Sequence, residues 1–144
     1  MFVLIVGAGR VGAAVAKHAL SLGHEVSVID EDALSHERLD AGQGGTWEEA
    51  GGRFTVGTAL ELDALREAGI EQAELFIAST DGDNTNLVIA QIAQRQFGVR
   101  KVIARVMDPA RAAWYGDQGL HTISPAQEAI DMFKEALRAH AETL

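Results

Sequence analysis

Three glycines near the N-terminus have the spacing of a turn that can hold a phosphate. Gly7, Gly9 and Gly12 occur in the run GAGRVG, directly after an apolar stretch at 1–6 and before a segment of helical periodicity that continues to Leu22. In such a unit the first glycine makes the sharp turn, the second lets the backbone approach a pyrophosphate, and the third lets the helix pack on the sheet. Backbone N–H groups then point at the ligand, where the helix dipole favours negative charge. The pattern predicts a nucleotide site.

An acidic residue ends the next apolar run and supports this prediction. Asp30 closes the run EVSVID, roughly 20 residues past the glycines, where an acid binds the hydroxyls of a ribose. Glu31 and Asp32 follow it, and three carboxylates would repel the 2′-phosphate of NADP(H). The predicted ligand is therefore NAD(H) or ATP/ADP. FAD stays open from the fingerprint alone, although flavin enzymes commonly need more protein around the flavin ring.

The rest of the chain alternates strand and helix patterns. Strands are predicted at 1–6, 25–30, 53–56, 74–79, 101–106 and 121–123. Helices are predicted from the glycine run to residue 22 and at 33–39, 60–68, 84–97, 110–115 and 126–144. Asp108 and Pro109 are typical of a helix start. This alternation predicts an α/β fold, a Rossmann-like, doubly wound and mainly parallel six-stranded sheet. The Gly-rich stretch 42–52 is the clearest predicted loop, and its Trp47 has no evident role.

Size and charge exclude several classes of protein. At 144 residues with 47% hydrophobic and 23% charged residues, the chain fits one globular domain, without room for a separate substrate domain. A net charge of −9 disfavours nonspecific binding to nucleic acid or anionic lipid. The apolar N-terminal run is part of the first strand, and no stretch has the length of a membrane span. We expect a cytoplasmic protein.

The sequence offers little for catalysis or metal binding. Tyr115 has Gly119 four residues on, so the Tyr-x-x-x-Lys pair of short-chain dehydrogenases is absent. Without cysteines, and with five histidines that show no paired spacing, no metal site is expected. Asp81 and Asp83 flank a glycine beside the predicted pocket; they either cap a helix or contact a ligand or cation. We therefore predict binding rather than enzymatic activity.

The last predicted helix carries an apolar stripe, formed by Ala126, Ile130, Phe133, Leu137, Ala141 and Leu144. This stripe either packs on the sheet of its own domain or leaves the domain and packs on another subunit. The helix predicted at 84–97 is apolar nearly all round, which indicates two buried sides. Together the two helices favour a homodimer or a higher homo-oligomer.

Several separated stretches resemble the regulator-of-potassium-conductance domain, also called KTN or TrkA-N. They are VGAGRVG at 6–12, VID ending at Asp30, VGT at 56–58, IASTDGDNTN at 77–86, IARVMDP at 103–109 and ISP at 123–125. Members of this family are cytoplasmic subunits or domains that bind NAD(H) or adenine nucleotides and gate potassium channels or transporters. The resemblance implies the same role here, with the membrane subunit of such a system as partner. It also implies that the protein lies at the inner face of the membrane through that partner.

The resemblance also implies a set of binding residues. The phosphates would lie on the turn, the adenosine ribose on Asp30 and the adenine near Thr58. Thr80 and Asp81 would border the pocket at the end of the fourth strand, and Arg105 would supply a positive charge near it. The full set is Gly7, Ala8, Gly9, Arg10, Val11, Gly12, Asp30, Thr58, Thr80, Asp81 and Arg105. Arg10 is either a phosphate ligand or solvent-exposed. Thr58 departs from many relatives, in which an acid follows the glycine.

Many relatives continue into a second lobe that binds an additional effector. The 144 residues are expected to form a minimal regulator or a part of a longer protein. Two other functions stay open: the NAD-binding half of a dehydrogenase, and an NADH-sensing interaction protein unrelated to potassium.

Overall fold

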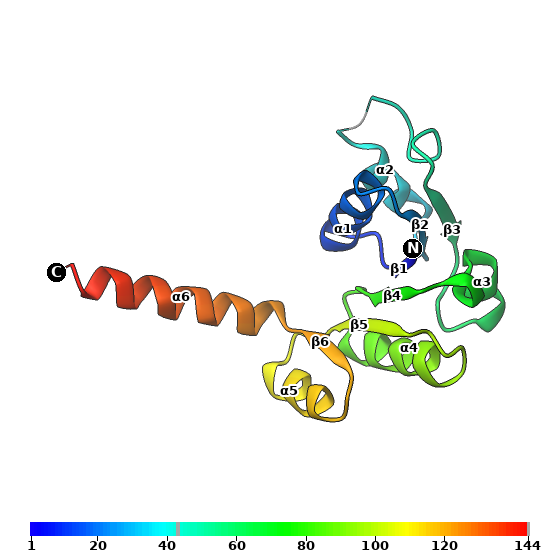
Figure 1. Cartoon of the computed structure of the whole chain (residues 1–144). Coiled ribbons are helices and arrows are strands. Elements are labelled where there is room, and N and C mark those ends of the chain that lie inside the picture. Colours follow the sequence, from blue (N-terminus) through cyan, green and yellow to red (C-terminus); the bar gives the residue numbers. More distant parts are fainter. Residues whose placement is uncertain (43, 144) are drawn as a thin grey trace.

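Six parallel strands form one sheet in the computed structural model, which describes residues 1–42 and 44–143 (Figure 1). The strands are β1 (Phe2–Val6), β2 (Glu25–Asp30), β3 (Arg53–Val56), β4 (Leu75–Ala78), β5 (Lys101–Arg105) and β6 (His121–Ile123). Their order across the sheet is β3-β2-β1-β4-β5-β6. The chain therefore builds outward from β1 in one direction, and crosses back to β4 to build in the other. The predicted doubly wound, parallel fold is confirmed.

The helices also follow the predicted pattern closely. They are α1 (Arg10–Ser21), α2 (His36–Asp40), α3 (Leu62–Ala68), α4 (Asp83–Arg95), α5 (Pro109–Asp117) and α6 (Pro125–Ala141), with short 3-10 turns η1 (Ala33–Ser35) and η2 (Ile70–Gln72). The helix predicted at 33–39 is divided, because Asp32 caps the η1 turn: its carboxylate accepts the Leu34 N–H at 2.9 Å. Asp108 caps α5 as expected, accepting the Ala110 N–H at 3.0 Å.

Alternate residues of the central strands build two separate cores. Val3, Ile5 and Val28 face α1 and α2 on one side of the sheet. Leu4 and Phe76 face α3 and α4 on the other. Figure 1 shows α1 and α2 on one side of the strands and α3 and α4 on the other. Both faces of β1 are thus covered, which explains why its sequence is apolar without alternation.

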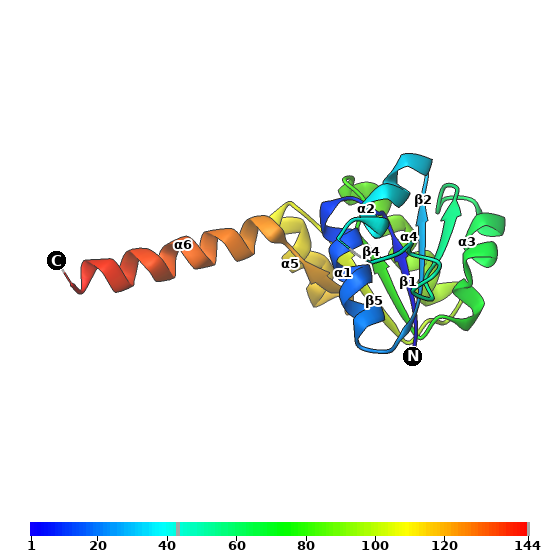
Figure 2. The same ribbon diagram turned by 90° about the horizontal axis from the view of Figure 1, so that it is seen from above.

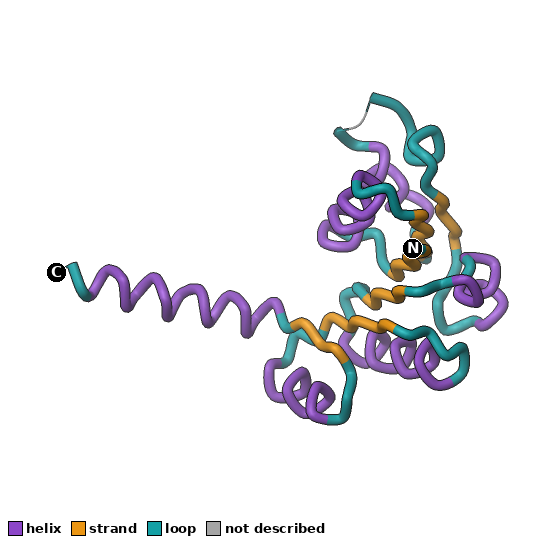
Figure 3. Tube along the Cα trace, viewed as in Figure 1, coloured by secondary structure: helices purple, strands orange, loops and turns teal. Residues whose placement is uncertain are grey.

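Trp47 belongs to the core, although it lies in the predicted loop. The described residues of that segment, 44–52, form neither helix nor strand, as Figure 3 shows. The indole is nonetheless fully buried and packs in the core with Leu39. Its Nε1–H donates to the Arg53 carbonyl at 2.9 Å, and its backbone N–H donates to Asp40 at 2.7 Å. The loop is therefore anchored to the domain by this side chain.

The C-terminal helix α6 projects away from the sheet (Figures 1 and 2). None of its described residues is buried, and Phe133 and Leu137 are 77% and 72% exposed. The interpretation that α6 packs on the sheet of its own domain is therefore wrong. The preceding strand β6 lies at the edge of the sheet, and the helix continues outward from that edge. Leu144, the last member of the predicted stripe, lies outside the described residues.

No helix within 1–42 and 44–143 is both long and apolar enough to cross a bilayer.

Helix α4 buries Leu87, Ile89 and Ala93 but leaves Val88 48% exposed. Within one chain, α4 therefore has one buried side, and the second buried side expected from its sequence stays a prediction about an oligomer.

Candidate nucleotide site

At two of the three motif glycines, Gly7 and Gly12, a side chain would clash with neighbouring backbone atoms at the end of β1. Gly7 has φ +100°, and a Cβ there would lie 2.7 Å from the Ser79 carbonyl oxygen. A Cβ on Gly12 would lie 1.8 Å from the Gly7 carbonyl oxygen, so the start of α1 touches the turn directly. A Cβ on Gly9 would meet nothing within 4 Å. Gly7 and Gly12 therefore shape the turn, whereas Gly9 leaves open space.

Asp30, at the end of β2, is hydrogen-bonded to the turn. Its Oδ2 accepts the Ala8 N–H at 2.7 Å, and its Oδ1 accepts the Asp32 N–H at 2.8 Å. Each carboxylate oxygen has two lone pairs, so each keeps one for a further donor. The side chain is thus fixed in place and still able to accept hydrogen bonds from two sugar hydroxyls.

A network of hydrogen bonds holds the facing wall, at the end of β4. The Ser79 hydroxyl donates to the Val6 carbonyl at 2.9 Å. Asn86 is buried; its Oδ1 accepts the Thr80 N–H at 2.9 Å, and its Nδ2 donates to the carbonyls of Thr80 and Arg105 at 3.0 and 2.9 Å. Arg105 also donates to the Thr80 carbonyl at 3.0 Å. The wall is therefore tied to both α4 and β5.

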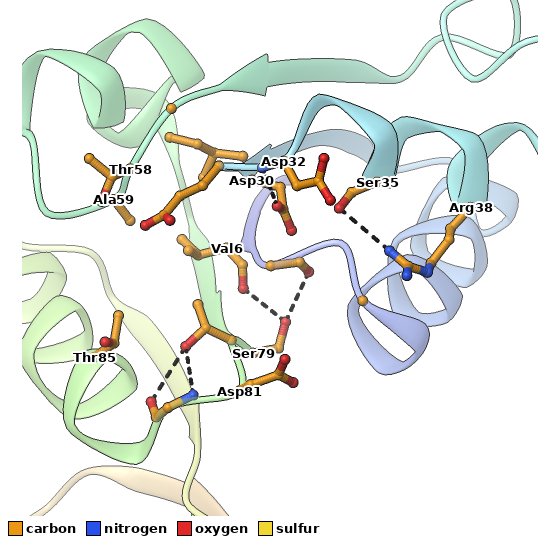
Figure 4. Close-up of a pocket in the computed structure, with 17 residues that line it drawn as sticks. Val6, Asp30, Asp32, Ser35, Arg38, Thr58, Ala59, Ser79, Asp81 and Thr85 are labelled. Atoms are coloured by element: carbon orange, nitrogen blue, oxygen red, sulfur yellow. Dashed lines mark hydrogen bonds between the residues drawn. The ribbon is translucent and has the colours of Figure 1, made fainter.

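Between the two walls lies an open cavity of about 450 Å³, which is within the usual range for small-molecule sites. It lies where β1 and its neighbours β2 and β4 end, the position at which doubly wound sheets bind ligands. Figure 4 shows side chains from both walls directed toward this space. The lining residues are Val6, Gly7, Gly9, Ile29, Asp30, Glu31, Asp32, Ser35, Arg38, Gly57, Thr58, Ala59, Ser79, Thr80, Asp81, Gly82 and Thr85.

Six of the eleven predicted binding residues line this cavity: Gly7, Gly9, Asp30, Thr58, Thr80 and Asp81. The other five lie around it. Ala8 is buried behind the turn and donates to Asp30, and Gly12 packs against Gly7. Arg10 and Val11 are exposed on the first turn of α1. Arg105 lies behind the β4 wall, with its guanidinium 3.5 Å from the carboxylate of Asp81.

Neither aspartate beside Gly82 caps α4. The N-cap position is Gly82 itself, which has no side-chain cap hydrogen bond. Asp83 instead accepts the backbone N–H groups of Met107 and Asp108 at 2.7 and 3.1 Å, because its side chain reaches the loop after β5. Asp81 is fully exposed and pairs with Arg105. The capping interpretation is therefore wrong, and Asp81 remains free to contact a ligand.

Sequence reasoning missed a positive side chain in the cavity wall. Arg38 on α2 lines the cavity, and its Nη1 donates to the Ala8 carbonyl at 3.3 Å and to the Ser35 hydroxyl at 3.4 Å. The residues directly after β2 are acids, Glu31 and Asp32, and give no sign of this positive charge. Arg38 follows Asp30 by eight positions and reaches the site because α2 folds back over the turn. Glu31 and Asp32 line the same cavity.

Comparison with known proteins agrees with this geometry. The TrkA-N domain family matches residues 3–125. The Trk system potassium uptake protein TrkA of Streptomyces coelicolor is 41% identical over 145 residues, covering 100% of this chain and 62% of its own length. The chain thus spans less than two thirds of that relative.

Solved structures share the fold. The TrkA-N domain of the inner membrane protein YbaL from Escherichia coli has a TM-score of 0.79 at 22% identity, covering 94% of this chain and 96% of its own. The GsuK channel bound to NAD has a TM-score of 0.77 at 21% identity, covering 99% of this chain and 24% of its own. GsuK has also been solved bound to ADP. With the match of the family to residues 3–125, these findings show that the chain belongs to the TrkA-N domain family.

Proposed function

We propose that this protein is a nucleotide-sensing regulatory subunit, or part of one, of a potassium transporter or channel. One observation carries the proposal: an open cavity lies at the switch point of the sheet, between a glycine turn and a fixed carboxylate. The chain around this cavity is matched over its whole length by a potassium uptake protein. TrkA of Streptomyces coelicolor is named as a potassium uptake protein and GsuK as a channel, neither as an enzyme, and the proposed role is binding without catalysis.

The cavity suits an adenine nucleotide such as NAD(H) or ATP/ADP. A diphosphate would lie on the turn at the N-terminus of α1, where free N–H groups and the helix dipole favour anions. The ribose would lie against Asp30, whose two oxygens each keep an acceptor site. Thr58 and Ala59 line the part of the cavity next to β3 and would border the base. Asp30, Glu31 and Asp32 disfavour a 2′-phosphate, and Arg38 offsets part of their charge.

Regulation requires that the ligand bind two arrangements of the assembly with different affinities. The exposed apolar side chains of α6 would pack on a second copy of the chain, giving a homodimer or a higher homo-oligomer. Hydrogen bonds connect the start of α4, next to the cavity, with α6. Asp83, the first residue of α4, accepts the Met107 N–H, and the Ser124 hydroxyl, which caps α6, donates to the Met107 carbonyl at 3.0 Å. The membrane subunit of the potassium system would respond to the assembly from the cytoplasmic side.

Titration calorimetry with NAD⁺, NADH, ADP and ATP tests the proposal. We expect binding of at least one of them, and we expect Asp30→Ala to weaken it by about 1–3 kcal/mol, about 5- to 150-fold in Kd, through the lost hydrogen bonds to the ribose. Glu37→Gln, an exposed change on α2 outside the cavity, is the control and should bind as the unchanged protein does.

Two results would contradict the proposal. One is the absence of binding for all four nucleotides at millimolar concentration. The other is steady nicotinamide turnover with pooled hydroxy acids, followed by absorbance, because this would favour the NAD-binding half of a dehydrogenase.

A further inference from the structure

Three side chains with metal-binding chemistry converge outside the nucleotide cavity. His36 and Asp40 lie one turn apart on α2, and Glu48 lies on the segment between α2 and β3. His36 Nδ1 is 3.2 Å from an Asp40 carboxylate oxygen, and His36 Nε2 is 2.5 Å from a Glu48 carboxylate oxygen. One potential ligand atom from each of the three residues lies within 4.8 Å of the other two. None of the three lines the cavity.

The surrounding structure holds two of these side chains in place. The second carboxylate oxygen of Asp40 accepts the backbone N–H of the buried Trp47 at 2.7 Å. The His36 ring packs edge-on against Phe54 of β3, with 5.2 Å between ring centroids. The side chain of Glu48 is 51% exposed and can turn. Two ligands are thus preoriented by contacts to the core, and the third is adjustable, as in many metal sites with an ordered outer shell.

Asp40 and Glu48 place a carboxylate at each of the two nitrogens of the His36 ring. Ionised carboxylates are acceptors only, and a neutral imidazole has one N–H and one lone pair. With a carboxylate at each ring nitrogen, a neutral His36 would place one nitrogen lone pair against a carboxylate oxygen. Among the described residues, no lysine or arginine forms an ion pair with Asp40 or Glu48. A metal ion between a ring nitrogen and a carboxylate would replace this contact between two acceptors with two coordination bonds.

We propose that His36, Asp40 and Glu48 form a binding site for a divalent transition metal ion of the Zn²⁺ type. Imidazole nitrogen with carboxylate oxygen suits such ions, whereas Ca²⁺ and Mg²⁺ prefer oxygen ligands alone. Two atoms that each lie about 2.1 Å from one ion are at most about 4.2 Å apart. The ligand atoms lie within 4.8 Å of one another, but Asp40 lies at Nδ1 and Glu48 at Nε2 of the ring. An ion held by all three residues therefore requires the exposed Glu48 side chain to turn toward the ring nitrogen that faces Asp40. Water would complete the coordination.

A metal ion at this position would fasten the segment containing Trp47 and Glu48 to α2. Helix α2 also carries Arg38, and the preceding turn carries Ser35, both in the wall of the nucleotide cavity. The metal would therefore stabilise that wall from outside without contacting the nucleotide. Metal binding and nucleotide binding can be measured separately, so each proposal can fail without the other.

Equilibrium dialysis of the whole chain against Zn²⁺, together with visible absorption of the Co²⁺-loaded protein, tests the site. We expect one equivalent of tightly bound metal and a rise in Tm on adding Zn²⁺. His36→Gln and Glu48→Gln should each weaken binding by more than about tenfold and remove the rise in Tm. His140→Gln, which changes an exposed histidine on α6, is the matched control and should keep both.

Circular dichroism should show that all three variants are folded; Glu48→Gln is the critical one, because its exposed side chain is not needed for packing. Absence of bound zinc would overturn the proposal. Zinc bound equally by the unchanged protein, His36→Gln and Glu48→Gln would also overturn it, because the metal would then be held elsewhere.

Discussion

Gly9 and Gly12 lie three residues apart in one motif, yet the structure predicts opposite consequences when each is changed to alanine. A Cβ on Gly12 would lie 1.8 Å from the Gly7 carbonyl oxygen and 2.9 Å from the Ser79 hydroxyl. A backbone carbonyl cannot rotate away as the end of a long side chain can. A Cβ on Gly9 would meet nothing within 4 Å, and Gly9 lines the cavity.

The expected magnitudes follow from these contacts. In an α-helix, alanine is better than glycine by about 1 kcal/mol, but forcing a methyl group into a packed site costs about 1–3 kcal/mol or more. Because the Gly12 contact is with backbone, we expect Gly12→Ala to lower the free energy of unfolding by about 2 kcal/mol or more. For Gly9→Ala, a small loss at the N-cap is offset by the reduced entropy of the unfolded chain, so we expect a change below about 1 kcal/mol.

The effect on nucleotide binding is a second property by which the role of Gly9 can be tested. The second glycine of the motif is the one that lets the backbone approach a pyrophosphate, so the added methyl group of Gly9→Ala should weaken binding by more than about tenfold while the protein stays folded. Urea unfolding followed by circular dichroism measures the free energy of unfolding of each variant, and calorimetry with the nucleotide measures its binding affinity. If Gly9→Ala binds as tightly as the unchanged protein, the phosphates do not lie on this turn. If Gly12→Ala is as stable as the unchanged protein, the contact with Gly7 does not constrain the fold.

Two further predictions concern the wall and the projecting helix. Asn86→Leu leaves the Thr80 N–H without its partner and removes one donor from each of the Thr80 and Arg105 carbonyls, of which the Thr80 carbonyl keeps Arg105, so it should lower the free energy of unfolding by about 2–4 kcal/mol. Asn84→Ala, on the exposed side of α4, is its control in urea unfolding, and equal stability of the two variants would contradict the role given to Asn86. Phe133→Glu should weaken self-association by more than about tenfold, because a buried phenylalanine contributes about 1.5–3 kcal/mol; Lys134→Glu is its control. Light scattering measures the mass, and an unchanged protein that is monomeric at high concentration would refute packing of α6 on a second copy.

The features predicted correctly from the sequence are those set by neighbours along the chain. β2, β3 and β6 begin and end at the predicted residues, because their apolar runs are bounded by glycine, aspartate or polar residues. The glycine turn also follows from a short segment, since strand, turn and helix adjoin. Asp30 could be placed beside the turn because β1 and β2 are adjacent parallel strands, with Val6 opposite Ile29.

The features that were missed depend on contacts between distant residues. The residues next to Trp47 in the sequence are mostly glycine and polar residues, which gives no sign that the indole is buried. Its burial depends on packing with Leu39 and on a hydrogen bond to the Arg53 carbonyl. The orientation of α6 depends on the position of β6 at the edge of the sheet. A stripe of apolar residues on a helix indicates that something covers it, and does not indicate which chain provides the cover.

His36, Asp40 and Glu48 show the same limit for the chemistry of sites. A search for paired histidines or cysteines detects metal sites whose ligands share one local motif. Here one ligand lies four residues and another twelve residues from the histidine, and the second comes from a segment without regular structure. What brings Glu48 to the ring is the burial of the adjacent Trp47, which fixes that segment against α2. Because the indole is fixed by its packing and by Arg53, the position of Glu48 is a consequence of the hydrophobic core. A change to Trp47 would separate Glu48 from His36 and Asp40, which stay together on α2, without altering any of the three residues.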